Sequence, residues 1–440
     1  MKSKWIVLIL FSFFAVNIHA QSQAYSLQQA QDYAAQNHNS TKAAALDVLG
    51  AQATVGEVLS TGLPQLSGSV DYTNFLKLPT SLIPAEFFGG EPGEFAEVQF
   101  GTKQNITAGL SFSQLLFNGS WLVGVNAAKT YVGLLESQQK LTEVDVRKNV
   151  ELAYYTALVS SESENIWQKN IDNLSKTLND VTALNKQGFV EEIDVDRLKI
   201  SLSNLQTNLE NVKRQTELAK TFLKFQIGID VNQEIELTDS LDILQSDFIF
   251  IDNDQNYLSR PEFDILETTR ILNDYNVRIN KAGYYPSLVL TGSYQQNAQR
   301  NEFDFFNADQ PWFETALVGV SLQVPIFDGL NKKHKIENAQ IGLQKAELMQ
   351  QTTTQAIQLE IAKAKTDYQN ALNDLENQQS NITLAEKIYN VSLIKYQQGV
   401  GSSLELTSAE SSLFQTQGAY IGALYNLLNA KANLKRALGY

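Results

Sequence analysis

The most regular pattern of apolar positions in this chain lies between residues 357 and 396. Its positions follow one another at intervals that alternate between four and three: Ile357, Ile361, Ala364, Tyr368, Ala371, Leu375, Gln378, Ile382, Ala385, Tyr389, Ser392 and Tyr396. This is the repeat of helices in a coiled coil. The pattern stops at Gln-Gln-Gly-Val-Gly, residues 397–401, where glycine ends a helix at little cost. A second apolar pattern covers residues 404–438, so the sequence predicts a long helical hairpin with its tip near Gly399.

Four shorter segments alternate apolar and polar residues with a period of two, which predicts strands with one apolar face. They cover about residues 66–76, 104–117, 287–297 and 314–327. In the first segment, for example, Leu66, Val70 and Tyr72 alternate with polar residues. Strands of about ten residues cross a bilayer when they are tilted. The stretch 77–103 between the first two strands is rich in proline and glycine and predicts a long loop.

The same order of elements occurs twice along the chain. A helix, two strands and a long helical hairpin occupy residues 21–228 and again residues 260–440, on either side of an acidic segment at 229–259. The helices expected in addition to the second hairpin cover about residues 26–62, 120–187, 193–228 and 261–282. The two tips, Gly188 and Gly399, lie 211 residues apart, and we conclude that the chain is one duplicated unit.

The four predicted strands cannot form a membrane barrel by themselves. The smallest closed membrane barrels have about eight strands, and open strand edges are not tolerated in lipid. We therefore expect several protomers to pool their strands into one barrel, with the polar faces lining a wet interior. The alternative is a soluble four-stranded sheet packed on helices, although no segment of the sequence offers an apolar layer to cover it.

Composition and charge exclude several classes of function. The chain has 34 basic and 48 acidic residues and a net charge of −14, which argues against nucleic acid as a partner. It has no cysteine, and this excludes disulfides, thiolate metal sites, a thiol nucleophile and a lipidated N-terminal cysteine. His38 and His334 are solitary, and no glycine-rich phosphate loop is present. The sequence thus predicts no enzyme, no cofactor and no metal site.

The N-terminus is typical of a secretory signal peptide, residues 1–20. Lys2 and Lys4 precede an apolar stretch from residue 5 to 16, and Ile-His-Ala at 18–20 resembles a cleavage site. The alternative is a membrane anchor helix, but the apolar stretch is short for one. No later segment is long and apolar enough for a transmembrane helix, so an exported chain would enter a membrane only as strands.

The acidic segment 229–259 contains eight carboxylates and no Lys or Arg: Asp230, Glu234, Glu236, Asp239, Asp242, Asp247, Asp252 and Asp254. Calcium binding is the alternative to a solvated belt, but the spacing of an EF-hand is absent. We expect a solvated belt.

The duplicated order of elements and two motifs resemble the TolC-type outer-membrane efflux protein family. The motifs are Tyr-Gln-Gln-Gly-Val-Gly-Ser-Ser-Leu-Glu-Leu at 396–406 and Pro-Ile-Phe-Asp-Gly at 325–329. The resemblance covers essentially the whole mature chain. It implies an α+β membrane protein: a homotrimer in which each protomer gives four strands to a shared twelve-stranded β-barrel in the outer membrane of a Gram-negative bacterium. The helices would form a tapering coiled-coil tunnel in the periplasm, with the acidic segment in a belt around its middle.

The resemblance also implies a function, that of the outer-membrane duct of a tripartite efflux or type I secretion system. Such a duct is passive and exports substrates from an inner-membrane pump of the RND or ABC type through a periplasmic adaptor. The adaptor would dock on the helical tips, formed by Gly188, Phe189, Val190, Gly399, Val400 and Gly401. The expected strand-to-helix junctions are at Phe117, Gly119, Pro325, Phe327 and Gly329. The exported substrate is not predicted.

A gate at the tunnel entrance is implied for Asp194, Tyr396 and Glu405. Glu405 matches an acidic residue that rings the entrance in the family, and the position of a second acidic ring holds Ser408. Tyr396 and Asp194 match a closing hydrogen bond between the two hairpins, whereas Gly401 stands where the family has an arginine. The alternatives are a solvated glutamate at a helix start for Glu405 and an ordinary seam aromatic for Tyr396.

Two other functions are alternatives to the duct. A structural coiled-coil scaffold of the periplasm would not explain four alternating strands of bilayer length. A membrane-embedded enzyme would need a nucleophile with its base or a cluster of metal ligands, and the sequence suggests neither.

Overall fold

The computed structural model describes residues 23–241 and 256–439 of the chain. The predicted signal peptide and the acidic residues Asp242, Asp247, Asp252 and Asp254 lie outside them. The chain forms two compact units. One is a helical unit of Met1–Ala45, Gln138–Phe263 and Thr352–Tyr440, and the other is a sheet unit of Leu46–Ser137 and Asp264–Gln351.

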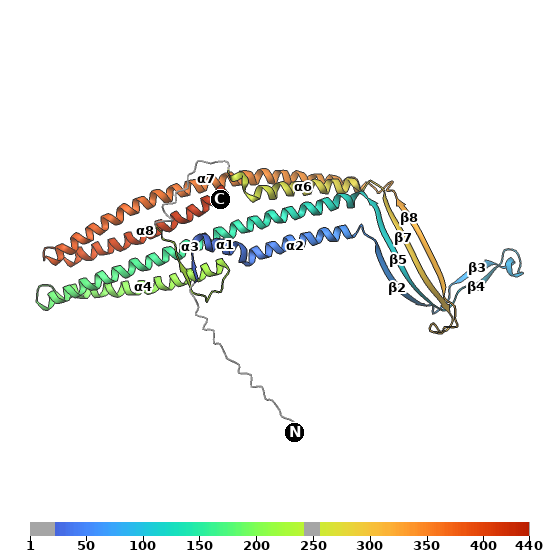
Figure 1. The fold of residues 1–440 in the computed structure, drawn as a ribbon, viewed down its shortest axis with the longest axis horizontal. Helices are drawn as coiled ribbons and strands as arrows, with labels where there is room; N and C mark the ends of the chain where they lie inside the picture. The colour runs from blue at the N-terminus through green and yellow to red at the C-terminus, as the bar shows by residue number, and fades with distance from the viewer. Residues whose placement is uncertain (1–22, 242–255, 440) are drawn as a thin grey trace, which may run out of the picture. The chain divides into compact units, whose positions relative to one another are not determined.

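Two long helical hairpins dominate the chain. Helices α3 (Gly119–Lys186) and α4 (Glu192–Ile227) form the first, and α7 (Asn331–Gln397) and α8 (Ser403–Leu438) form the second. The parts of these hairpins that belong to the helical unit lie side by side (Figure 1). Nine of the twelve predicted seam positions of α7 are buried, and the other three are half-buried. The period of 3.5 residues therefore marks the buried stripe of this helix.

Near the tips the four helices of the two hairpins share one apolar core. It contains Leu174 and Val181 of α3, Leu198 and Leu205 of α4, Tyr389 and Tyr396 of α7, and Leu406 and Leu413 of α8. Each hairpin alone would leave its apolar stripe in water. The first and second repeats therefore stabilise each other by burial of these side chains.

The rest of the helical unit is built around α1 (Leu27–Asn37). Ser26 caps this helix, and strand β1 (Gln23–Tyr25) pairs in parallel with β6 (Ile235–Leu237). The carboxylate of Asp239 accepts a hydrogen bond from the backbone N–H of Leu27 at 2.7 Å. This acid of the 229–259 segment thus holds the start of a helix, a role that goes beyond the predicted solvated belt. A short 3-10 helix, η2 (Asn256–Ser259), follows later in the chain.

The first helical pattern, predicted over residues 26–62, is in fact two helices. His38 has an extended backbone conformation with ψ of 140°, which separates α1 from α2 (Asn39–Ser60). At this break the backbone N–H of Ser40 donates to Nδ1 of His38 at 3.2 Å, which caps the start of α2. Apolar periodicity does not reveal a local side-chain bond of this kind. Helix α6 (Pro261–Ala282) has the predicted bounds.

The sheet unit contains one antiparallel sheet of four strands in the order β2-β5-β7-β8 (Figure 1). The strands are β2 (Gln65–Asn74), β5 (Gln104–Asn118), β7 (Ser287–Arg300) and β8 (Phe313–Gln323). The register places Leu66 opposite Phe112, Leu110 opposite Tyr294, and Tyr294 opposite Ala316. Directly opposed residues share a face, so the apolar faces predicted for the separate strands form one continuous surface.

That apolar surface is exposed. Leu66 is 70% exposed and Val318 is 82% exposed, and Val70, Leu110, Val320 and Leu322 are exposed as well. No helix among the described residues of the unit buries these side chains. This contradicts the alternative of a soluble sheet packed on helices. Within the described residues, no helix has the length and the apolar character needed to cross a membrane.

The strand-to-helix junctions differ between the repeats. Phe117 lies in β5 just after a bulge, and Gly119 begins α3 directly, where a Cβ would come within 3.1 Å of the carbonyl oxygen of Ala282. Strand β8 ends at Gln323, four residues before the predicted end at 327. Pro325 has no N–H to donate to a strand ladder, which accounts for the early end.

Residues 324–328 instead form an irregular link, and residues 329–330 a turn, before α7. Phe327 is exposed, and Gly329 has a φ of +66°. The carboxylate of Asp328 then accepts from the backbone N–H of Lys332 at 3.0 Å and so caps the start of α7.

The stretch 77–103, predicted as a loop, contains a small antiparallel hairpin. Strands β3 (Thr80–Pro84) and β4 (Phe95–Gln99) pair over their full length, and a 3-10 turn, η1 (Ala85–Phe88), follows β3. Pro84 ends its strand, and Gly89 takes a φ of +81° just after the turn. These breaking residues therefore lie at the end of the strands, which is why their abundance concealed the hairpin.

Candidate functional site

The two hairpin tips have the same backbone geometry. Gly188 has a φ of +80° and Gly399 a φ of +73°. In each tip two backbone N–H groups donate to carbonyl groups of the preceding helix. In the first tip Gly188 donates to Asn185 at 2.9 Å and Phe189 to Leu184 at 3.0 Å. In the second tip Gly399 donates to Tyr396 and Val400 to Lys395, both at 3.0 Å. This is the Schellman motif, which needs the left-handed conformation that glycine accepts without a Cβ penalty.

Each tip presents apolar side chains to solvent. Phe189 is 74% exposed and Val400 is 75% exposed, and Ile193 and Leu404 in the next helices are exposed too. Val190 is half-buried, and its carbonyl accepts from the side chain of Asn185 at 2.9 Å. Contiguous exposed apolar side chains mark contact sites, which makes these residues candidates for a protein contact.

Gly401, which stands where the related family has an arginine, lies in a crowded place. A Cβ there would come within 3.0 Å of the Lys395 Cβ and 3.1 Å of the Tyr396 nitrogen. Its own N–H donates to the carbonyl of Lys395 at 3.1 Å. A side chain at this position would require the end of α7 to shift by a few tenths of an ångström, so the tip geometry favours glycine here.

Glu405 lies in the first turn of α8, which Ser402 caps through a bond from the Glu405 N–H at 3.1 Å. Its carboxylate is exposed and pairs with the ammonium group of Lys395, at the end of α7, at 3.2 Å. The predicted ring of carboxylates would therefore have a cation beside each carboxylate. An exposed pair of this kind is worth about 0–1 kcal/mol, so it affects charge more than stability.

The structure brings Tyr396 close to Asp194 but does not form the predicted hydrogen bond. The Tyr396 hydroxyl is buried and has no hydrogen-bond partner among the described residues. Burial raises the pKa of Tyr396, and the nearby charge of Asp194 raises it further. The ring itself packs in the four-helix core. In one protomer, then, Tyr396 joins the hairpins by packing.

Direct polar contact between the two hairpins comes from residues that the sequence analysis missed. Ser403, Glu410 and Gln417 of α8 repeat every seven residues, and each bonds to the first hairpin. The Arg197 guanidinium donates to Ser403 Oγ at 3.0 Å, Ser201 Oγ to Glu410 Oε2 at 2.9 Å, and the Asn170 amide to Gln417 Oε1 at 2.6 Å. We call these three positions the α8 polar ladder. Their heptad spacing was the available signal.

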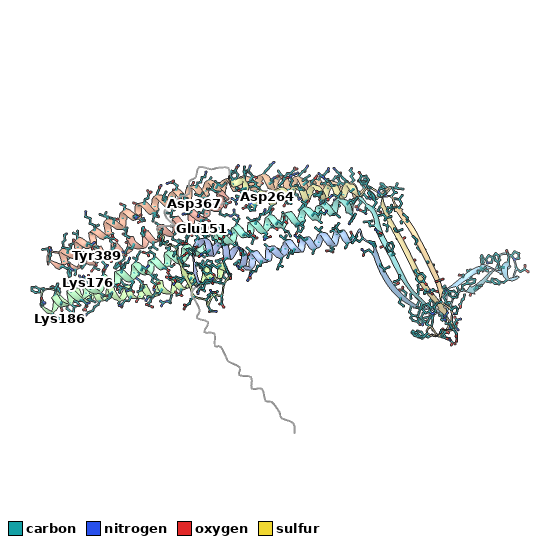
Figure 2. The ribbon with its side chains drawn as sticks, viewed as in Figure 1. Glu151, Lys176, Lys186, Asp264, Asp367 and Tyr389 are labelled. Carbon is teal, nitrogen blue, oxygen red and sulfur yellow. The ribbon has the colours of Figure 1, made fainter. Side chains whose placement is uncertain are left out.

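Figure 2 labels Lys186, the last residue of α3, at the first tip, and Tyr389 on α7 farther from the tips. Tyr389 belongs to the same buried core as the tip residue Tyr396. Over the residues that the structure describes, His, Asp and Glu side chains nowhere gather in the groups of three that could hold a metal ion. The tips, with their shared backbone geometry and exposed apolar side chains, are the candidate site.

The chain matches known proteins over both repeats. Residues 30–228 and 259–440 match the family model described as outer membrane efflux protein. The pyoverdine export outer membrane protein OpmQ of Pseudomonas aeruginosa is 23% identical over 345 residues, which cover 76% of this chain and 70% of OpmQ. The cation efflux system protein CusC of Escherichia coli K12 is 23% identical over 347 residues, which cover 78% of this chain and 73% of CusC.

Solved structures show the same fold. A crystal structure of CusC matches with a TM-score of 0.74 and 20% identity, covering 94% of this chain and 92% of the other. The outer membrane channel CmeC of Campylobacter jejuni matches with a TM-score of 0.72 and 19% identity, covering 94% and 85%. These likenesses confirm the predicted fold class, an α+β membrane channel with barrel strands and a helical tunnel. The chain belongs to the outer membrane efflux protein family, as an efflux channel of the cell outer membrane that extends into the periplasm.

Proposed function

We propose that this chain forms a homotrimeric duct that exports substrates passively from an inner-membrane pump, of the RND or ABC type, through a periplasmic adaptor. Members of the family are trimeric and work with an adaptor and a pump. The open edges of β2 and β8 support a shared barrel, because backbone groups at an edge must find partners in lipid. The apolar face of the sheet would then meet outer-membrane lipid.

The entrance of the duct is at the hairpin tips. The observation that carries this part of the proposal is that both tips end in the same Schellman motif, expose Phe189 and Val400, and lie beside one four-helix core. An adaptor would dock on the exposed side chains. Asp194, Tyr396 and Glu405 would line the gate, which closes by packing of the Tyr396 ring rather than by a bond from its hydroxyl.

The substrate would be chosen by the pump. OpmQ is named for pyoverdine export and CusC for cation efflux, and these cargoes have little chemistry in common. A conduit that serves such different systems needs no selective binding site of its own. It also needs no catalytic group, because the pump supplies the energy.

Single-channel conductance of the detergent-extracted protein in a planar bilayer tests the duct and its gate. We expect the wild type to be mostly closed. Tyr396→Ala should raise the mean conductance several-fold, since truncating a buried aromatic residue costs about 3–5 kcal/mol of packing. Tyr396→Phe keeps the ring and should stay closed, which makes it the matched control.

Two results would contradict the proposal in different ways. A protein that remains soluble, or that never conducts in any variant, is not a duct. A protein that conducts equally as wild type, Tyr396→Ala and Tyr396→Phe is a duct whose gate lies elsewhere.

A further inference from the structure

Glu410 is the central rung of the α8 polar ladder, seven residues from both Ser403 and Gln417. Ser403 is the first residue of α8, and its partner Arg197 is exposed near the tip. Glu410 is only 2% exposed. A carboxyl group therefore lies in the middle of the polar ladder, beside the apolar core that the two hairpins share.

Three helices surround this carboxyl group. Ser201 of α4 donates its single hydrogen bond. Tyr389 of α7 lies close enough for the charge of Glu410 to raise its pKa, and Thr177 of α3, also buried, bonds to Tyr389. Among the described residues no Lys, Arg or His forms an ion pair with Glu410. The carboxylate is thus buried with one neutral donor and no counter-charge, an arrangement that favours the protonated form.

Burial of Glu410 determines how the packing of the hairpins depends on pH. Burial raises the pKa of Glu410 above its ordinary value of 4.5, and the bond from Ser201 offsets part of this rise. Separation of the hairpins would return the carboxyl to water and to its ordinary pKa. The packed state of the hairpins therefore binds the proton more tightly. The stability of this packed state falls as the pH rises from the ordinary pKa of Glu410 through its raised pKa.

We infer that Glu410 is a further gating residue: its protonation holds the two hairpins of a protomer together, and its ionisation loosens them. The inference rests on the proposed gate at the tips and adds a form of regulation to it. A more acidic periplasm would favour the closed entrance. Ionised Glu410 would leave the hairpins ready for an adaptor to separate.

Spin labels on the full-length protein test this directly, because the chain has no native cysteine to replace. Gln187→Cys and Gln398→Cys place one label on each tip at corresponding, exposed positions. We would measure the distance distribution between the labels by pulsed electron resonance from about pH 5 to about pH 8. The variants are Glu410→Gln, Ser201→Ala and, as the matched control, Glu386→Gln, an exposed glutamate on α7.

We expect the distribution of the parent protein to broaden and lengthen as the pH rises. Glu410→Gln, which mimics the protonated form, should stay narrow at every pH. Ser201→Ala should move the transition to higher pH because it removes the donor that favours the ionised form. The Glu386→Gln control should respond as the parent does.

A pH response that persists in Glu410→Gln, or a parent distribution that does not change with pH, would overturn the inference. If Glu410→Gln does not fold, the pH midpoint of Ser201→Ala becomes the deciding measurement. A midpoint equal to that of the parent protein would then contradict the inference. Conductance measured in parallel separates the two proposals. Labels that move with Glu410 while conductance stays constant would refute the gate at the tips but not the proton-dependent contact.

Discussion

At the residue scale, the pair of Lys395 and Glu405 changes what the tip charge can do. The resemblance alone predicts a ring of glutamates, which would favour cations. In the structure each carboxylate has an ammonium group 3.2 Å away on the other helix of the same hairpin. Opposite charges at this distance largely cancel beyond the Debye length of about 8–10 Å. The ion selectivity of the entrance should therefore depend on both residues.

We predict that Lys395→Gln increases the preference for cations and that Glu405→Gln decreases it. Each change leaves one charge of the pair without its partner. Reversal potentials in a planar bilayer under a salt gradient measure the preference. The control is Lys387→Gln, which removes an exposed cation elsewhere on α7.

Stability should hardly change in these variants, because an exposed ion pair contributes about 0–1 kcal/mol. Unchanged reversal potentials in both pair variants would show that this part of the tips does not face the ion path.

At the scale of elements, the turn glycines Gly188 and Gly399 are required by backbone conformation alone. A Cβ at Gly399 or at Gly188 would meet no other heavy atom within 4 Å. Any cost of a larger residue there must come from the positive φ, which an L-residue adopts at a cost of about 1–2 kcal/mol.

We predict that Gly399→Ala lowers the free energy of unfolding by about 1 kcal/mol. Gly418→Ala is the matched control with the opposite sign, because Gly418 lies inside α8 and also has open space around its Cβ. Alanine in a helix interior is favoured by about 0.5–1 kcal/mol over glycine. Thermal unfolding of the purified variants measures both changes, and equal stabilities would refute this account of the tip.

The elements that the sequence predicts best are those whose pattern is long. The seam of α7 runs through twelve positions, and the helix ends next to the predicted tip. Short elements were not predicted, for physical reasons. The β3–β4 hairpin has only five residues in each strand, and the break at His38 rests on a local conformation rather than on periodicity.

The candidate site was predictable only in part. The tip glycines follow from the turn chemistry, and Tyr396 follows from the seam. The bonds of the α8 polar ladder depend on which residue of the first hairpin lies beside which residue of the second. That register is a tertiary property, so the sequence offers the spacing of Ser403, Glu410 and Gln417 but not their partners. The expected bond between Tyr396 and Asp194 is absent within the single protomer.

At the scale of the whole molecule, the alternation of side chains between the two faces of each strand decides which of them meet lipid. Val320 lies opposite Leu290 on the apolar face, and its neighbour Ser321 lies opposite Val289 on the other face. Both residues are exposed in the single chain. Exposure in one protomer therefore does not tell the two faces apart, whereas a charge placed on each face would.

We predict that Val320→Lys strongly reduces the amount of folded protein in the outer membrane and that Ser321→Lys does not. A lysine on the lipid side of a barrel costs about 2–4 kcal/mol near the middle of the bilayer, whereas one in a wet lumen keeps its hydration. Membrane fractionation, followed by gel mobility with and without heating, measures the folded fraction. Because the two positions are adjacent in β8, the strand, the chain length and the introduced residue are matched. Equal insertion of both variants would mean that the apolar face is covered by protein, and the four strands would then need a partner other than lipid.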